Sequence, residues 1–192
     1  MVARNPFDPG RQPGGRPPAP GRLALVQAYG NAFWDLDAGG VDEWADLAAY
    51  RAWLAARGFG ATAAEEDRAA AIAIREALRD LARANHDDAP PPPAALAILD
   101  RAGATARIRF GAEGAVHEAL GEGHAAATGL VLAVVAEAMA DGTWSRLKAC
   151  PGPHCGWMFY DASRNRSSHW CSMRICGNRV KGQAFRARQR AA

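Results

Sequence analysis

Four cysteines constrain the fold of this chain more than any other feature. They are the only cysteines among 192 residues, and they form two C-x4-C pairs separated by fifteen residues: Cys150, Cys155, Cys171 and Cys176. Two short-spaced cysteine pairs can bring four thiolates into the tetrahedral geometry that a structural Zn²⁺ ion accepts. All coordination positions are then filled, so no place remains for a catalytic water. The spacing therefore predicts one structural zinc site near the C-terminus.

Two disulfides are the alternative for four cysteines, and they require an oxidising compartment. Residues 1–21 are rich in Pro, Gly and Arg and lack the apolar stretch of an export signal. We therefore expect a metal site in a cytoplasmic protein. His154, inside the first cysteine pair, is expected to be a loop residue because four thiolates already complete the coordination.

The zinc segment is also small. The 49 residues from Trp144 to Ala192 are too few to bury an adequate hydrophobic core of their own. Zinc binding contributes about 10–16 kcal/mol in finger peptides near neutral pH, which exceeds the whole stability of a typical domain. We therefore expect residues 144–192 to fold with the metal and to unfold without it.

Charge is distributed as unevenly as cysteine. From Trp144 onward ten Lys or Arg stand against one acidic residue, Asp161, for a formal charge of +9, whereas Met1–Thr143 carries thirteen against nineteen, or −6. A four-thiolate zinc core carries −2, which Arg146 and Lys148 are placed to compensate. The excess of +7 that remains favours a polyanion as the partner.

Helical geometry places many of these cations on a helix that we expect after the second cysteine pair. At about 100° per residue, the stripe that would pack on the finger is Met173, Val180, Ala184 and Ala187. The two flanking basic rows are Arg174, Lys181 and Arg188, with Phe185 among them, and Arg179, Arg186 and Arg190. Six cations without an acid favour nucleic-acid contact over a merely solvated face. Gly182 costs this helix about 1 kcal/mol relative to Ala, so we expect fraying or a bend there.

The run from Cys150 to Arg190 resembles the CGNR zinc finger. That family takes its name from a tetrad that is here Cys176, Gly177, Asn178 and Arg179. The likeness also includes Trp157, Phe159, Asp161, the run 163–165 and the run 170–173. The resemblance implies a treble-clef finger, in which a zinc knuckle with a hairpin supplies two ligands and the first turn of a helix supplies two. It also implies DNA binding, and we expect the contacts to come from Arg164, Arg166, Arg174, Asn178, Arg179, Lys181, Arg186, Arg188 and Arg190.

The chain before the finger resembles the ABATE domain, a mixed helical and β module. The resemblance rests on the run LALVQAYGN at Leu23–Asn31, on Trp53 and Leu54, and on the basic lead-in RLKAC at residues 146–150. It implies a stress-linked transcription regulator whose N-terminal domain binds a small ligand of unknown identity. The family usually has Asn-Thr where this chain has Asn31-Ala32, so no polar site is carried over to that position.

The residues themselves predict an α+β chain in three parts. Residues 1–21 form a disordered arm, residues 22–143 a mainly helical domain with a small β-hairpin, and residues 144–192 the treble-clef finger. The expected helices are Leu23–Phe33, a second with Val41, Trp44, Leu47 and Leu54 on its inner face, Thr62–Asn85 opened by a capping box of Thr62 with Glu65, Leu96–Leu99, and His124–Ala140. The expected hairpin joins Ala104–Phe110 to Ala115–Leu120. His124–Ala140 is too short and, with Glu137, too polar to span a membrane, and is expected to be the buried central helix.

Enzymatic function has little support in the sequence. No GxSxG or P-loop string occurs, and the histidines outside the finger are scattered: His86, His117 and His124. Trp34, Trp44 and Trp53 are expected in the core and Glu137 at the domain edge. The sequence predicts a non-enzymatic, DNA-binding transcription regulator with one structural Zn²⁺ and no membrane association. A zinc-stabilised protein-protein interaction module and an RNA-binding protein are the alternatives, and salt dependence separates a polyanion partner from an apolar protein interface.

Overall fold

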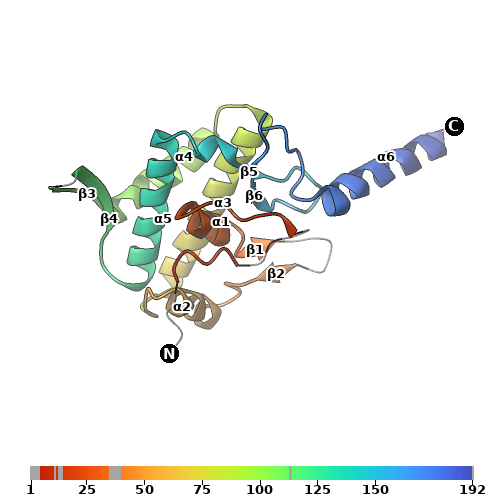
Figure 1. Cartoon of the computed structure of the whole chain (residues 1–192). Coiled ribbons are helices and arrows are strands. Elements are labelled where there is room, and N and C mark those ends of the chain that lie inside the picture. Colours follow the sequence, from red (N-terminus) through yellow and green to blue (C-terminus); the bar gives the residue numbers. More distant parts are fainter. Residues whose placement is uncertain (1–4, 11, 13–14, 35–39, 113, 192) are drawn as a thin grey trace.

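Helices dominate the N-terminal part of the protein. The structure, a computed structural model, describes residues 5–10, 12, 15–34, 40–112 and 114–191. The helices before the finger in this part of the chain are α1 (Leu23–Gly30), α2 (Leu47–Ala56), α3 (Glu65–Asp87), α4 (Pro93–Ala102) and α5 (Gly123–Ala140). Helix α5 lies among the others and packs against α1, α2, α3 and α4 (Figure 1).

The sequence of α5 suits a central position. A helix that is apolar on all sides must be covered on all sides, either by protein or by lipid. Among the described helices, α5 is the one that is long and apolar enough to cross a membrane by composition, and half of it is buried inside the protein. Glu137 lies at the edge, where its carboxylate accepts a hydrogen bond from Arg22 Nη1 at 2.7 Å. The prediction of a buried central helix is confirmed.

Helix α3 forms because its apolar residues recur at helical spacing. Its buried face carries Ala71, Ile74, Leu78 and Leu81. Three acidic residues in its first turn stabilise the N-terminus of the helix, since they lie at the positive end of the helix dipole. The carboxylate of Asp67 accepts a hydrogen bond from the Ala64 N–H at 2.7 Å. The helix therefore begins after Ala64, and the predicted capping box opened by Thr62 is wrong.

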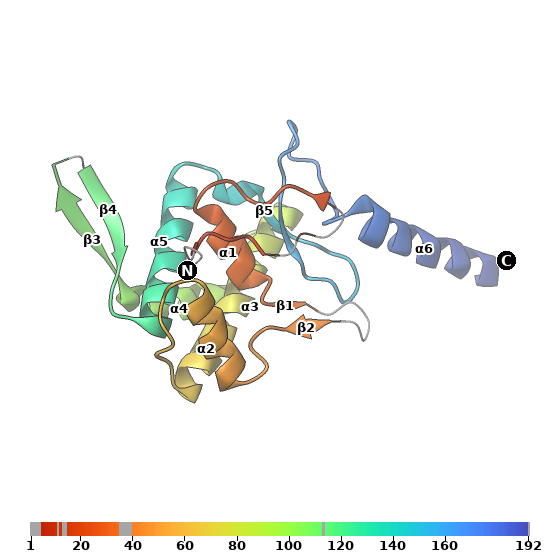
Figure 2. The ribbon, with the colours of Figure 1, turned by 60° about the horizontal axis from the view of Figure 1, so that its bottom comes forward.

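Three short antiparallel hairpins accompany the helices in the described residues. They pair β1 (Phe33–Trp34) with β2 (Val41–Asp42), β3 (Ala106–Gly111) with β4 (Gly114–Ala119), and β5 (Leu147–Ala149) with β6 (Met158–Tyr160). The β3–β4 hairpin was predicted from the sequence. It projects away from the helices (Figure 2), which leaves Phe110 81% exposed. A mostly helical N-terminal region with small antiparallel hairpins is therefore confirmed.

The first two predicted helices are shorter than expected. Helix α1 ends at Gly30, and the chain then enters the β1 strand. Val41 lies in β2 with 43% of its surface exposed, and is not on the inner face of a helix. Helix α2 begins only at Leu47, because the carboxylate of Asp46 caps its first turn by accepting the Ala49 N–H at 2.8 Å.

Aromatic rings fill the core beside α1. Tyr29 contacts Trp44 and Trp53 edge to face, with ring centroids 4.8 Å and 5.8 Å apart. Trp44 also packs edge to face on Tyr50 at 5.1 Å. These geometries are the favoured ones for aromatic pairs. The expectation that Trp44 and Trp53 belong to the core is confirmed, whereas Trp34 packs on the zinc segment.

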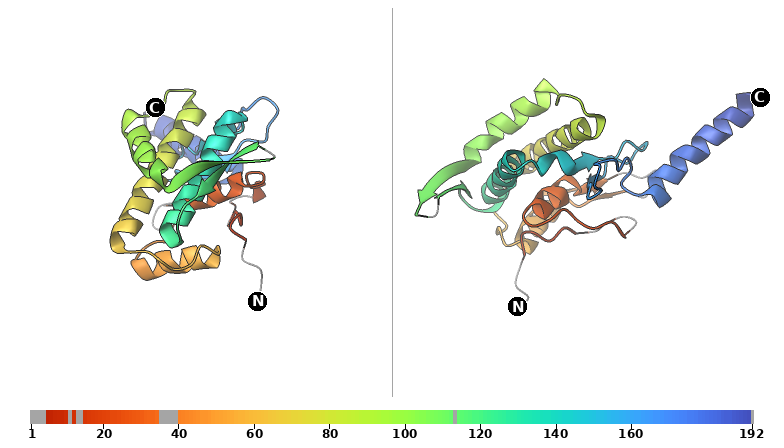
Figure 3. Two further views of the ribbon diagram at one scale, coloured as in Figure 1. Left: turned by 90° about the vertical axis from the view of Figure 1, so that its left-hand side faces the viewer. Right: turned by 45° about the horizontal axis from the view of Figure 1, so that its top comes forward.

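The C-terminal segment is shared between the helical core and an outward helix. Leu147, Ala149 and Met158 belong to the same hydrophobic core as α1 and α3, and β5 packs against α3. Helix α6 (Asn178–Ala191) instead projects away from the rest of the molecule (Figures 1 and 3). The finger hairpin is thus built into the helical domain, and the finger helix is not.

The described part of the predicted N-terminal arm lies against the protein. Ala19 is buried, and its N–H donates to Gln27 Oε1 at 2.7 Å. Arg16 reaches the zinc segment, where it hydrogen-bonds to the Cys171 carbonyl at 2.9 Å. These contacts are made by isolated polar groups that composition does not reveal. The expectation of a disordered arm is therefore not met for these residues.

Candidate metal centre and nucleic-acid interface

The four cysteines are positioned by a hairpin and by a helical turn. Cys150 follows β5, Cys155 lies in the turn before β6, Cys171 precedes the turn η4 (Met173–Gly177), and Cys176 lies within η4. All four are buried, and their Sγ atoms lie within 4.8 Å of one another. The predicted four-cysteine cluster is confirmed.

The sulfur positions fit a zinc ion. Four Zn–S bonds of about 2.3 Å in tetrahedral directions place neighbouring sulfurs about 3.8 Å apart. The Sγ atoms of Cys155 and Cys171 are 3.7 Å apart, and those of Cys171 and Cys176 are 3.6 Å apart. A disulfide would bring two sulfurs to about 2.05 Å, and all four cysteines are unbridged. The cluster is a single structural zinc site, in which the metal crosslinks the segment and leaves no position for a reacting ligand.

Ionisation of all four thiols would require a cation. Hydrogen bonds from the three neighbouring thiols hold the pKa of Cys150 far below its usual range. The pKa values of Cys155 and Cys171 are raised, first of all by their hydrogen bonds with Cys150. Four thiolates at this separation repel one another strongly. A divalent metal that prefers thiolate ligands removes this conflict, and zinc is such a metal.

The knuckle between the first two cysteines depends on a small residue. A Cβ atom at Gly152 would lie 3.2 Å from Cys176 Sγ, which is closer than ordinary packing allows. His154 lies in the same turn with a φ of 57°, is exposed, and lies outside the metal cluster. It is a loop residue, as the sequence predicted.

A buried ion pair behind the zinc site was missed by the sequence analysis. Lys148 Nζ lies 2.8 Å from Asp161 Oδ2, and Asp161 is fully buried. The same carboxylate accepts hydrogen bonds from the N–H groups of Ser163 at 3.0 Å and Ser168 at 2.9 Å. Burial alone would raise the pKa of Asp161, but the hydrogen bonds from Lys148, Ser163 and Ser168 outweigh it and hold the pKa below its usual range.

This ion pair corrects one expectation about charge. Arg146 donates to the carbonyls of Asp161 at 3.0 Å and Ser163 at 2.9 Å. Arg146 and Lys148 therefore hold the loop that begins at Asp161, and their partners are not the thiolates. Asp161 is the single acidic residue from position 144 onward, and that isolation was the available signal for a structural ion pair.

Arg16 links the N-terminal segment to the metal centre. Its Nε donates to the Cys171 carbonyl at 2.9 Å and its Nη2 to the Trp170 carbonyl at 3.0 Å. The guanidinium also stacks on the Phe159 ring, 4.8 Å from its centroid. These contacts satisfy carbonyls next to a zinc ligand. No pattern in the Pro/Gly-rich segment distinguishes this arginine from its neighbours.

Asn31 joins the helical domain to the finger hairpin. Its Nδ2 donates to the Met158 carbonyl at 2.8 Å, and its Oδ1 accepts the Met158 N–H at 2.7 Å. Both residues are buried. The amide therefore pairs with β6 in the way that a neighbouring strand would. This role needs an amide and does not need the hydroxyl that the ABATE resemblance leads one to expect at position 32.

The predicted DNA-contact residues lie in three places. Those on α6 are exposed, apart from Arg179, which is half-buried: Asn178, Arg179, Lys181, Arg186, Arg188 and Arg190. Arg174 is exposed within η4, and Arg164 is exposed in the loop after β6. Arg166 is turned toward the start of the zinc segment, since its Nη1 donates to Ser145 Oγ at 2.9 Å in the turn Trp144–Arg146. The structure thus gathers a basic surface on α6 but does not bring Arg166 to it.

The expected helical rows need correction. η4 is a π-type turn, in which the Gly177 N–H donates to the Ser172 carbonyl at 3.2 Å, five residues earlier. This wider turn changes the phase, so Arg174 does not continue the row of Lys181 and Arg188. The predicted packing stripe is also wrong, because α6 projects outward and leaves Ala184 and Ala187 exposed. The helix runs without a break through Gly182.

Two protein-family models match the chain. Residues 22–142 match the ABATE model, described as "Putative stress-induced transcription regulator", and residues 146–189 match the CGNR zinc finger. The two matches meet at the start of β5, where the helical domain and the metal segment share their core. No curated protein matches the chain in sequence.

Proposed function

The chain belongs to the ABATE family of stress-induced transcription regulators, and on that premise we propose that its CGNR finger docks on DNA and that its helical domain senses a small ligand. The family description implies a non-enzymatic protein. A cytoplasmic location is part of this proposal, since a transcription regulator works where its DNA lies. The finger is proposed to be a treble clef, because a knuckle with a hairpin supplies Cys150 and Cys155, while Cys171 just before η4 and Cys176 within η4 supply the other two ligands.

One observation carries the DNA proposal: α6 is an exposed helix next to the metal site, and all of its charged residues are basic. It has five Lys or Arg and no acidic residue over fourteen residues. It leaves the body of the protein directly after Cys176 and touches little of it (Figure 3). The DNA major groove admits an α-helix, and cations beside it neutralise phosphates. We propose that α6 enters the groove while Arg164 and Arg174 contact the backbone nearby.

A protein partner is the second candidate, because α6 also exposes an aromatic side chain. Phe185 is 56% exposed on the helix, and Met173 is 46% exposed at its base. Such residues are typical anchors in protein interfaces. Salt dependence distinguishes the candidates, since binding through phosphates releases counterions and binding through apolar anchors does not.

The test is a salt titration of duplex DNA binding by the zinc-loaded full chain, followed by fluorescence anisotropy. If about five phosphates are contacted, log K falls against log salt with a slope of about −4 to −5. Changing Arg186 and Arg190 together to Gln is expected to reduce the slope by about two units. Arg101→Gln, on an exposed position of α4, is the matched control and is expected to leave binding unchanged. A flat response supports the protein partner, and tighter binding of single-stranded RNA supports the RNA alternative.

Arg179 needs a separate test because it is half-buried. As a DNA contact, Arg179→Ala weakens binding by about 1–3 kcal/mol and leaves the zinc content unchanged. As a brace of the finger, the same change lowers the zinc content, while Arg186→Ala keeps it. We propose the DNA contact, and zinc analysis of both variants decides between the roles.

A further inference from the structure

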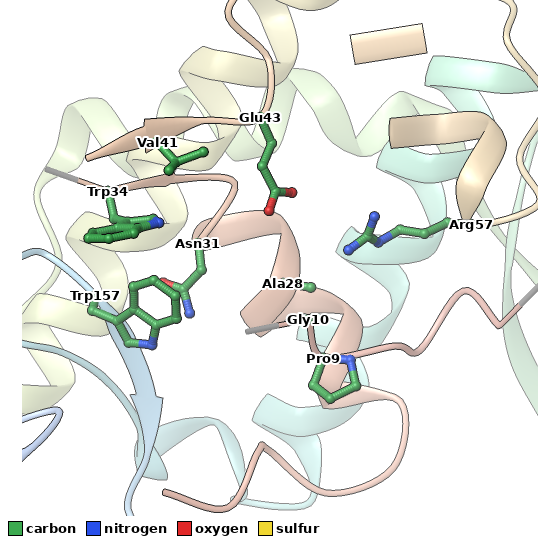
Figure 4. Close-up of a pocket in the computed structure, with 9 residues that line it drawn as sticks. All are labelled: Pro9, Gly10, Ala28, Asn31, Trp34, Val41, Glu43, Arg57 and Trp157. Atoms are coloured by element: carbon green, nitrogen blue, oxygen red, sulfur yellow. The ribbon is translucent and has the colours of Figure 1, made fainter. Parts of the chain in front are cut away.

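A cavity of about 90 Å³ lies where three parts of the chain meet. The N-terminal segment, the helical domain and the zinc segment all contribute to its wall (Figure 4). The lining residues are Pro9, Gly10, Ala28, Asn31, Trp34, Val41, Glu43, Arg57 and Trp157. The volume corresponds to about three water molecules, so an occupant must be compact.

Two opposite charges line this cavity. Glu43 and Arg57 extend toward one another from opposite sides of the cavity (Figure 4), and the charge of each favours the ionised form of the other. The guanidinium of Arg57 is held in place by stacking over the Trp53 ring, 3.9 Å from its centroid. Burial raises the pKa of Glu43 although Arg57 and Trp53 act against it, and burial lowers the pKa of Arg57 although the charges of Glu43 and Asp8 act against it. Loss of hydration is thus the largest effect on both groups. A molecule between them could satisfy both.

Two buried donors in the wall lack an acceptor. Arg57 Nε and Trp157 Nε1 are both buried, and neither has a hydrogen-bond partner among the described residues. Trp157 is 4% exposed, and its ring packs edge to face on Trp34 at 5.7 Å. A buried N–H without an acceptor is costly and uncommon in folded proteins. The wall therefore offers one carboxylate and two unused donors.

We propose that this cavity binds a small zwitterion, with an ammonium group at Glu43 and a carboxylate at Arg57 and Trp157. Free amino acids of the smallest size have this chemistry. The proposal rests on the proposed ligand-sensing role of the helical domain and names the site and the ligand class. A molecule with only one charge would engage only one of Glu43 and Arg57, which gives the site its specificity.

The location of the cavity couples an occupant to the metal centre. The Trp157 carbonyl accepts the N–H of the zinc ligand Cys150 at 2.9 Å. Asn31, another wall residue, holds the next residue along the chain, Met158. A zwitterion would therefore touch the helical domain and the zinc knuckle at once. Its binding energy would favour the docked arrangement of the two.

The test is calorimetric titration of the zinc-loaded full chain with glycine and with β-alanine. Acetate and methylammonium, each carrying one of the two charges, are the comparison ligands. We expect saturable binding of at least one zwitterion, and at least about tenfold weaker binding of either single-charge ligand. Glu43→Gln and Arg57→Gln are each expected to weaken zwitterion binding by about tenfold or more. Trp157→Phe keeps the ring, loses the N–H, and is expected to weaken binding less.

The control variants are Glu66→Gln and Arg101→Gln, at exposed positions on α3 and α4, and they are expected to bind like the parent protein. Zinc content and far-UV circular dichroism establish that each variant is folded. The proposal is overturned if neither zwitterion saturates the protein below about 10 mM, or if folded Glu43→Gln binds it as tightly as the parent. Because this titration contains no DNA, its failure leaves the DNA proposal standing. Conversely, a loss of DNA binding with intact zwitterion binding overturns only the finger proposal.

Discussion

Replacing Asn31 by Ala is expected to loosen the junction between the helical domain and the finger hairpin. The side chain is 6% exposed and makes two hydrogen bonds to the backbone of Met158, which is fully buried. In the Ala variant the Met158 N–H loses its partner, which costs about 1–3 kcal/mol. The Met158 carbonyl keeps a second donor, Gln27 Nε2 at 3.2 Å, so its loss is nearer to an ordinary hydrogen bond of about 0.5–1.5 kcal/mol. The sum is a destabilisation of about 1.5–4.5 kcal/mol.

Urea denaturation of the zinc-saturated full chain, followed by circular dichroism, measures this free energy. With an m value of about 2 kcal/mol/M, the midpoint should fall by about 1–2 M. Asn31→Asp keeps an acceptor for the Met158 N–H but directs a carboxylate at the Met158 carbonyl, and should be no more stable than the Ala variant. Asn165→Ala, at an exposed loop position, is the control. A change of less than about 0.5 kcal/mol in Asn31→Ala would refute the bridging role.

Three further outcomes are expected. Gly30→Ala places a Cβ against Met158 Sδ and should destabilise the protein by about 1–3 kcal/mol, whereas Gly103→Ala, with open space around it, should be neutral or stabilising in the same melts. Asp161→Asn leaves Lys148 buried beside a neutral group and should lower the free energy of unfolding by about 3–5 kcal/mol near neutral pH. Because the pKa of Asp161 is lowered in the folded state, this difference in stability from the parent is complete above the unfolded pKa of about 4. It shrinks as the pH falls below that value. Elemental analysis should find one zinc per chain, and two disulfides in protein from reducing conditions would contradict the metal site.

The metal site could be predicted from the sequence because its information is local. Two pairs of residues at fixed short spacing define the ligands, and the geometry of zinc supplies the rest. The same holds for α5, whose composition dictates burial. By contrast, β1 and β2 contain two residues each. Such strands carry no periodicity, so a helix pattern running from Leu23 through residue 33 looked continuous although the chain turns after Gly30.

Single polar residues that act over long distances were also invisible. Arg16 hydrogen-bonds to a carbonyl 155 positions later in the chain, and Asn31 to one 127 positions later. Neither belongs to a repeated pattern, and the sequence alone does not distinguish either one from an ordinary exposed polar residue. The predicted angular positions of the side chains around α6 were wrong for a different reason. A 100° rotation per residue assumes α-helical turns throughout, and the π-type turn at η4 violates it.

The shared core changes the expected relation between zinc and folding. On size alone, residues 144–192 are a unit that only the metal holds together. In the structure, Leu147, Ala149 and Met158 lie in the helical core, so β5 and β6 have apolar partners that do not depend on zinc. The second apolar cluster contains the four cysteines with Trp157 and Phe159, and among the described hydrophobic residues before the finger only the partly buried Trp34 packs against it. Loss of zinc should therefore release η4 and α6 first. It should weaken the β5–β6 hairpin only on the side that faces the cysteine cluster. A signal that shifts the docking of the hairpin, through Asn31 or through the neighbouring cavity, could then reach the basic helix without unfolding the metal centre.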